Sequence, residues 1–136
     1  MIIKIPKEQL QKNINLEKGW YPAIFRKIWT EKNKNNPNLA NYWIACEILK
    51  DNRLIEQYMV RSDDMRGLQS LFESLSKTKV RVIEKVVQEN LELDPEQCYG
   101  TEIQVFIDQE PFNGRLIDKM KDFLPKGVST EVPFGG

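Results

Sequence analysis

The chain has 136 residues, of which 40% are hydrophobic and 29% charged, and its formal net charge is zero. This length fits one domain, and this composition is that of a globular protein and excludes wholesale disorder. The chain contains no histidine, which excludes Ser-His and Cys-His nucleophile pairs. Cys46 and Cys98 supply only two of the four ligands that a structural zinc ion requires. We therefore expect no enzymatic activity, no metal and no cofactor.

The charge is distributed unevenly. Residues 1–61 contain 11 lysines and arginines against 6 acids, whereas residues 62–136 contain 9 against 14. Binding of a polyanion depends on local potential, so a net charge of zero remains compatible with a nucleic acid partner.

The cellular location follows from two missing segments. No run of 18 apolar residues occurs, and the first residues lack the order of a signal peptide. We expect a cytoplasmic protein without a membrane partner.

The first predicted strand follows a polar, lysine-rich lead-in segment, residues 1–18. Alternating apolar residues predict a strand over residues 19–29. One face of it carries Tyr21, Ala23 and Phe25, and the other carries Trp20, Ile24, Arg26 and Ile28. Pro22 cannot donate a ladder hydrogen bond, so this strand should begin at an edge or a bulge. Residues 31–38 contain no apolar side chain and predict an exposed loop.

Two further strands complete a predicted antiparallel meander. In residues 39–49 one face carries Tyr42, Ile44, Cys46 and Ile48, and the other Asn41, Trp43, Ala45 and Glu47. Asp51-Asn52 predicts a tight turn, and residues 54–61 predict the third strand.

The middle of the chain predicts helices. Ser62 and Asp63 are good N-cap residues, and the apolar positions after them have helical spacing, at Met65, Leu68, Leu71, Phe72 and Leu75. This helix should end near Ser76. Residues 79–91 combine strand-favouring valines with acids and lysines, and we favour a helix over a strand there. Asp94-Pro95 predicts a short helical turn that Gly100 ends.

The last part predicts a hairpin. Residues 101–108 alternate again, residues 109–114 include the turn sequence Asn113-Gly114, and residues 115–120 return as the last strand. Residues 126–136 should form a flexible tail. Five antiparallel strands with a helical insertion between the third and the fourth describe a mainly β (α+β) domain, an OB-like barrel over residues 19–125.

This order of elements resembles that of small phage proteins, long of unknown function, that are regarded as single-stranded-DNA-binding OB folds. The resemblance rests on Gly19, Tyr21, Ala23 and Phe25, the loop 32–38, the strand with Tyr42, Ile44, Cys46 and Ile48, the leucine-rich residues 68–75, residues 94–105, and Phe123-Leu124-Pro125. It covers roughly residues 16–134. It implies a phage-encoded protein that binds single-stranded DNA in replication or recombination.

The tail carries a second resemblance. Single-stranded-DNA-binding proteins often finish with an acidic tail that ends in Pro-Phe and docks onto replication and repair partners. This chain has Pro133 and Phe134 there, but only Glu131 precedes them nearby, and Gly135-Gly136 follow. The resemblance implies docking of replication or recombination proteins through Pro133 and Phe134.

Single-strand binding requires aromatic faces for bases and cations for phosphates. All three tryptophans lie in the first half, among lysines and arginines. If Tyr42 and Ile44 point inward, Trp43 points outward. We predict that DNA contacts Arg26, Trp29, Lys32, Lys34, Trp43, Tyr58, Arg61, Arg115 and Lys119. Trp20 and Tyr21 are expected in the core, and Asp63-Asp64 should cap a helix rather than bind a metal.

Two other functions remain open. A protein-interaction adaptor of OB-like fold would use the same exposed aromatic residues as an interface. A nuclease would require a cluster of metal-binding carboxylates, which the spacing of the acids does not reveal. The sequence leaves open whether the protein forms a homo-oligomer.

Overall fold

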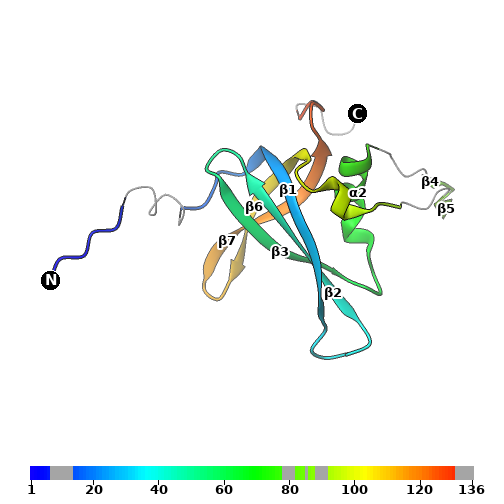
Figure 1. Ribbon diagram of the computed structural model, residues 1–136, viewed down its shortest axis with the longest axis horizontal. Helices are drawn as coiled ribbons and strands as arrows, with labels where there is room; N and C mark the ends of the chain where they lie inside the picture. Colours follow the sequence, from blue (N-terminus) through cyan, green and yellow to red (C-terminus); the bar gives the residue numbers. More distant parts are fainter. Residues whose placement is uncertain (7–13, 78–81, 85, 88–91, 131–136) are drawn as a thin grey trace.

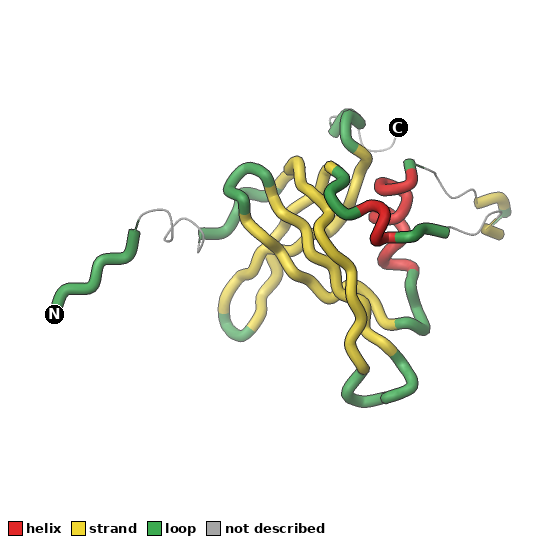
Figure 2. The backbone as a smooth tube through the Cα atoms, in the orientation of Figure 1, coloured by secondary structure: helices red, strands yellow, loops and turns green. Residues whose placement is uncertain are grey.

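A five-stranded antiparallel sheet dominates the structure (Figures 1 and 2). The computed structural model describes residues 1–6, 14–77, 82–84, 86–87 and 92–130. The strand order of the sheet is β3-β2-β1-β6-β7. Its strands are β1 (Gly19–Lys32), β2 (Ala40–Ile48), β3 (Arg53–Arg61), β6 (Glu102–Phe112) and β7 (Arg115–Pro125). The prediction of a mainly β fold with five antiparallel strands is therefore confirmed.

Short helices follow the third strand. They are the 3-10 turn η1 (Arg66–Leu68), the helix α2 (Gln69–Ser76) and the 3-10 turn η2 (Pro95–Cys98). Helix α2 packs against β7. Two short strands of two residues each, β4 (Val82–Ile83) and β5 (Val86–Val87), pair with each other beyond α2, away from the large sheet (Figure 1).

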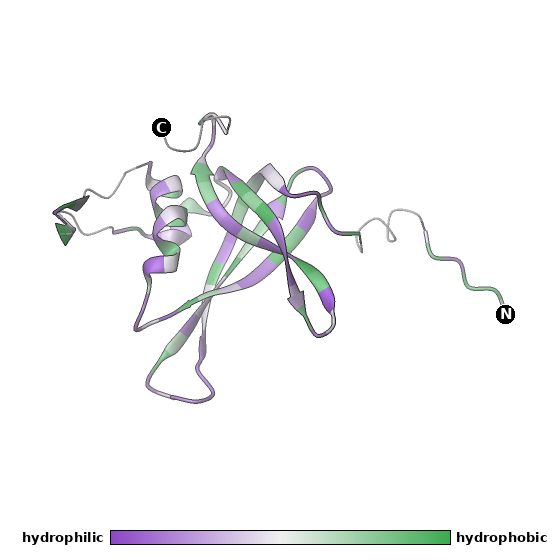
Figure 3. Ribbon diagram, turned by 180° about the vertical axis from the view of Figure 1, so that it is seen from behind, coloured by the Kyte–Doolittle hydropathy of each residue, from purple (hydrophilic) through white to green (hydrophobic). Residues whose placement is uncertain are grey.

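Alternation of apolar and polar residues builds the core, because successive side chains of a strand point to opposite faces. Figure 3 shows this alternation along the strands. The fully buried side chains include Phe25, Ile44, Cys46, Ile48, Leu68, Leu71, Ile103, Val105, Ile107 and Met120. Helix α2 contributes Leu71 and Leu75 to this core, so it lies on the inner face of the sheet.

A β-bulge at Arg26 changes which residues of β1 face outward. Phe25 pairs with Cys46, whereas Lys27 pairs with Ala45, so Arg26 is an extra residue in the ladder. The predicted outward position of Ile28 is wrong, because beyond the bulge Ile28 packs against the core. A bulge shifts the alternation by one residue, and this shift turns Trp29 outward.

The sheet is open rather than a closed barrel, so of the predicted OB-like barrel only the five-stranded antiparallel sheet is confirmed. Among the described residues, β3 and β7 are the two edges and form no main-chain ladder with each other. Side chains join them instead. The amide of Gln57 donates to Met120 O at 2.9 Å and accepts from Met120 N at 2.7 Å. This glutamine therefore provides the hydrogen bonds that a neighbouring strand would provide.

The turns follow the sequence closely. Asn52, Asn113 and Gly114 have φ values of 50°, 49° and 80°, the left-handed conformation that asparagine and glycine tolerate best. The turn between β6 and β7 comprises only Asn113 and Gly114, so β6 extends through Phe112 into the predicted turn, while β7 begins at Arg115 as predicted. The Asp94 cap of η2 is confirmed, because its carboxylate accepts from Glu96 N at 3.2 Å.

Two helix predictions are wrong. Ser62 and Asp63 do not cap the helix: Leu68 is the N-cap of α2 and makes no side-chain cap bond, and the hydroxyl of Ser62 instead accepts from Ala40 N. Within residues 79–91, the described residues include the strands β4 and β5 rather than a helix, as the β-branched valines there favour. The remaining residues of that segment and residues 131–136 lie outside the described residues.

Candidate nucleic-acid interface

Three aromatic side chains form a row across neighbouring strands on the outer face of the sheet. Trp29 of β1 pairs with Trp43 of β2, and Trp43 pairs with Tyr58 of β3. The two indoles are stacked, with ring centroids 6.2 Å apart and an interplanar angle of 18°. Tyr58 meets Trp43 edge to face, with centroids 6.0 Å apart. We call Trp29, Trp43 and Tyr58 the aromatic row.

The aromatic row lies outside the core but is not fully exposed. Trp29 and Trp43 are half-buried, and 41% of Tyr58 is exposed. The indole N–H of Trp43 is buried and has no hydrogen-bond partner among the described residues. This indole is therefore held by ring packing and not by polar contacts. The unpaired buried donor costs free energy, which the ring contacts must offset.

Trp20 and Tyr21 have different environments. Tyr21 belongs to the core, as predicted, and its hydroxyl donates to Glu17 O at 2.6 Å. Trp20 is half-buried outside the core. Its ring packs edge to face against Phe106 of β6, 5.4 Å away, so its predicted core position is wrong.

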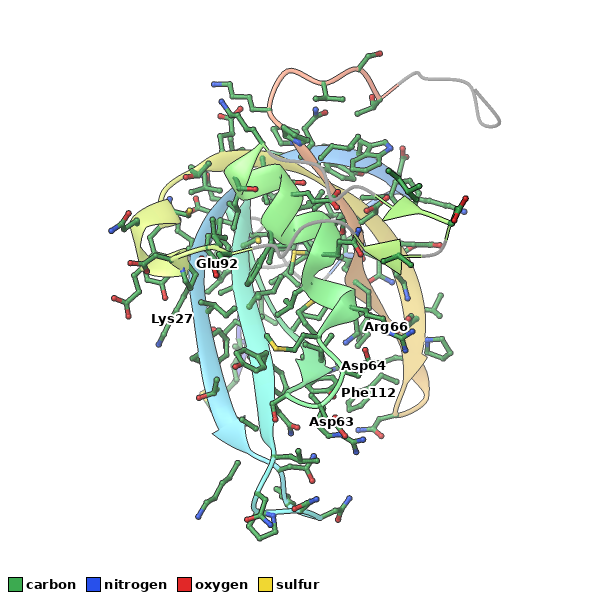
Figure 4. The ribbon with its side chains drawn as sticks, turned by 90° about the vertical axis from the view of Figure 1, so that its right-hand side faces the viewer. Lys27, Asp63, Asp64, Arg66, Glu92 and Phe112 are labelled. Atoms are coloured by element: carbon green, nitrogen blue, oxygen red, sulfur yellow. The ribbon has the colours of Figure 1, made fainter. Side chains whose placement is uncertain are left out.

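Lys27 is a neighbour of the aromatic row that the sequence prediction omitted. Its Nζ lies 5.3 Å from the centroid of a Trp29 ring, within the range of cation–π attraction. Figure 4 shows Lys27 on the outside of β1. Lys27 and Trp29 are two residues apart in β1, and strict alternation from the buried Phe25 would have placed both on the inner face. The bulge at Arg26 turns both to the outer face.

Two of the predicted cations already have anionic partners. Arg26 pairs with Glu47 at 2.6 Å, and Arg61 pairs with Asp63 at 2.7 Å. The hydrogen bond and charge of Asp63 raise the pKa of Arg61, and the same contact lowers the pKa of Asp63. These two arginines are therefore poorly placed to neutralise a phosphate without first breaking an ion pair.

Four other predicted cations form no ion pair within the described part of the chain: Lys32, Lys34, Arg115 and Lys119. Lys32 ends β1, and Lys34 lies in the loop that follows. Asn33 orders this loop, because its side-chain oxygen accepts from Asn35 N and Asn36 N.

Two open hollows connect the aromatic row with the β6–β7 hairpin. The first, of about 520 Å³, is lined by Arg26, Lys27, Trp29, Glu31, Ala45, Leu54 and Glu56. The second, of about 400 Å³, shares Leu54 and Glu56 with it and reaches Arg115 and Leu116. The structure thus brings Arg115 onto a path that starts at Trp29, whereas Lys119 lines neither hollow. Glu31 and Glu56 make this path mixed in charge.

Asp63 and Asp64 are engaged by arginines. Asp64 pairs with Arg66 at 2.8 Å (Figure 4), and hydrogen bonds from Arg66 lower the pKa of Asp64 to about 2. Within residues 1–6, 14–77, 82–84, 86–87 and 92–130, no three Cys, Asp or Glu side chains are placed to hold a metal ion. The two aspartates are therefore ion-pair partners of Arg61 and Arg66.

Pro133 and Phe134 lie outside the described residues. No described helix has both the length and the apolar character needed to span a membrane. The chain matches no protein-family model, and it has no significant match among curated proteins.

Proposed function

We propose that this protein binds single-stranded DNA with little sequence preference, in phage replication or recombination. The aromatic row carries the proposal. Stacking of a base on an aromatic side chain contributes about 1–3 kcal/mol and tolerates every base, because each base has a π-face. Trp29, Trp43 and Tyr58 present such rings across three strands.

We further propose that the open five-stranded sheet is OB-like, which would suit it to this function. OB folds are five-stranded, partly open barrels that bind oligonucleotides on the face of strands 2 and 3, between two flanking loops. Here Trp43 and Tyr58 lie on β2 and β3. The β1–β2 and β6–β7 hairpins project from the body on the same side in Figure 1. A nucleic acid strand could therefore lie across the row between the hairpins.

The charges around the row define the expected salt dependence. Around the row, Lys27, Lys32, Lys34 and Arg115 form no ion pair with another described residue, while Glu31 and Glu56 line the same path. For single strands, log K falls by about 0.7 per log unit of salt for each phosphate contact. We expect a slope of magnitude 3 or less by this estimate, with stacking supplying much of the affinity.

One observation favours a second candidate, the protein-interaction adaptor. Glu31 and Glu56 lie beside the aromatic row, and acidic side chains repel a polyanion but suit a basic protein surface. Aromatic residues are common hot spots of protein interfaces. In this case the row would contact a protein, and an oligonucleotide would not compete for it.

Quenching of tryptophan fluorescence by oligo-dT, measured over a series of salt concentrations, tests the proposal. A Trp20→Phe variant restricts the signal to Trp29 and Trp43, since Trp20 lies elsewhere against Phe106. We expect saturable quenching that weakens as salt rises. No quenching of this variant at low salt would refute DNA binding at the row and favour the adaptor.

A further inference from the structure

The Trp29 ring already contacts two side chains in the free protein. Trp43 stacks beside it, with centroids 6.2 Å apart, and the Lys27 ammonium lies 5.3 Å from a ring centroid. Trp43 is half-buried between Trp29 and Tyr58 and cannot easily leave. Lys27 is exposed and forms no ion pair within the described ranges. Lys27 is thus the neighbour that can move.

A base and the Lys27 ammonium are both attracted to the same face of the Trp29 ring. Both are drawn to the π-face, the ammonium by the ring quadrupole and the base by stacking. Glu31 and Glu56 line the same hollow as Lys27, yet the ammonium lies over the ring and pairs with neither carboxylate.

We propose that Lys27 covers the stacking face of Trp29 in the free protein and is exchanged for a base when single-stranded DNA binds. The released ammonium then contacts a phosphate of the same strand. The Lys27 side chain therefore opposes stacking of a base on Trp29 and, once released, favours binding through its phosphate contact. This inference rests on the proposed function.

The exchange has a distinctive signature. Without the Lys27 side chain, no cation–π contact must be broken before a base stacks, and one phosphate contact is lost. A cation–π contact at an exposed site corresponds to about a two- to fivefold change in affinity. One lost phosphate contact reduces the salt slope by about 0.7. A Lys27→Ala variant should bind oligo-dT more weakly than wild type at low salt and two- to fivefold more tightly at high salt.

Lys50 offers a matched control. Its Nζ lies 5.6 Å from the Tyr21 ring centroid, a comparable contact outside the aromatic row. Fluorescence titrations with oligo-dT should compare wild type, Lys27→Ala, Lys27→Met and Lys50→Met over a salt series. Lys27→Met keeps the side-chain stem, so it should reduce the salt slope like Lys27→Ala while gaining less affinity at high salt.

The possible results separate the two proposals. The exchange is supported if the plots of log affinity against log salt concentration for wild type and Lys27→Ala cross, and if Lys50→Met binds oligo-dT like wild type. If wild type binds but Lys27→Ala is weaker at every salt concentration, or is unchanged, Lys27 does not cover the stacking face and only this inference fails. If wild type does not quench at all, the proposed function fails as well.

Discussion

The Arg53 guanidinium and the Asp118 carboxylate form an ion pair across the open edge of the sheet, with Nη1 and Oδ2 2.6 Å apart. Only 12% and 8% of these side chains are exposed. Asp118 also accepts from Leu16 N and from the amide of Gln109, at 3.2 and 2.8 Å. A single carboxylate therefore links the lead-in segment, β6 and both edge strands.

Replacing Asp118 should strongly destabilise the fold. Asp118→Ala removes the nearer acidic partner of the largely buried Arg53, which keeps Asp51 at 3.6 Å. Removal of one partner of a buried pair typically costs about 3–5 kcal/mol, and we expect a loss toward the lower end of this range. Urea unfolding would measure this loss. Glu110→Ala is the control, because it removes the half-exposed pair of Glu110 with Lys121 on the same hairpin and should cost about 1 kcal/mol or less. Equal losses for the two variants would contradict a special role of Asp118.

Gln57 should protect the main chain of β7 from exchange with solvent. Gln57→Leu leaves Met120 N–H and C=O without their partner while preserving most of the side-chain volume, and we expect a loss of about 1–3 kcal/mol or more. Hydrogen exchange at the Met120 amide should accelerate. Gln104→Leu is the comparison, because Gln104 also donates to a β7 carbonyl, Pro125 O, but is less buried. Unchanged exchange at Met120 would show that Gln57 does not hold the edges together.

The tryptophans should contribute unequally to DNA binding. Trp29→Ala and Trp43→Ala should each lower the affinity for oligo-dT by about five- to 150-fold, the equivalent of one lost stacking contact. Trp20→Ala should have little effect, because Trp20 packs against Phe106 away from the row. Affinities are compared under conditions in which circular dichroism shows each variant to be folded. Equal losses for all three variants would refute the assignment of the face.

The two cysteines should differ in reactivity. Burial raises the pKa of Cys46 from 9.0 to about 12, and the pKa of the less buried Cys98 is raised as well, by burial and by Asp94. The thiolate is the reactive form, and access is required. An aromatic disulfide reagent should therefore modify Cys98 slowly in the native protein and Cys46 only after unfolding. Rapid modification of two thiols in the native protein would contradict the buried position of Cys46.

The same pKa predicts how stability depends on alkaline pH. The folded state holds the Cys46 proton more tightly than the unfolded state. The contribution of the protonated thiol to the free energy of unfolding is therefore complete below pH 9 and is lost as the pH rises toward about 12. A Cys46→Ala variant should lack this part of the alkaline decline in a series of urea-unfolding measurements. A decline identical to that of wild type would show that Cys46 is not its source.

The sequence by itself determined the properties that depend on neighbouring residues. Alternation in Tyr42–Ile48 determined a strand and its buried face, because successive side chains of a strand point to opposite sides. Asn113-Gly114 determined the hairpin, because these residues tolerate a left-handed backbone. Asp94-Pro95 determined the start of η2 in the same local way.

Only the tertiary structure decided the features that depend on contacts between distant residues. The bulge at Arg26 arises where β1 must pair with β2, and it turns Lys27 and Trp29 to the outer face. Arg61 and Arg66 engage Asp63 and Asp64, which local propensity assigned to capping. Whether the sheet closes depends on β3 and β7, whose partners Gln57 and Met120 are 63 residues apart. Pairing over such separations is set by the packing of the whole core, which no local pattern encodes.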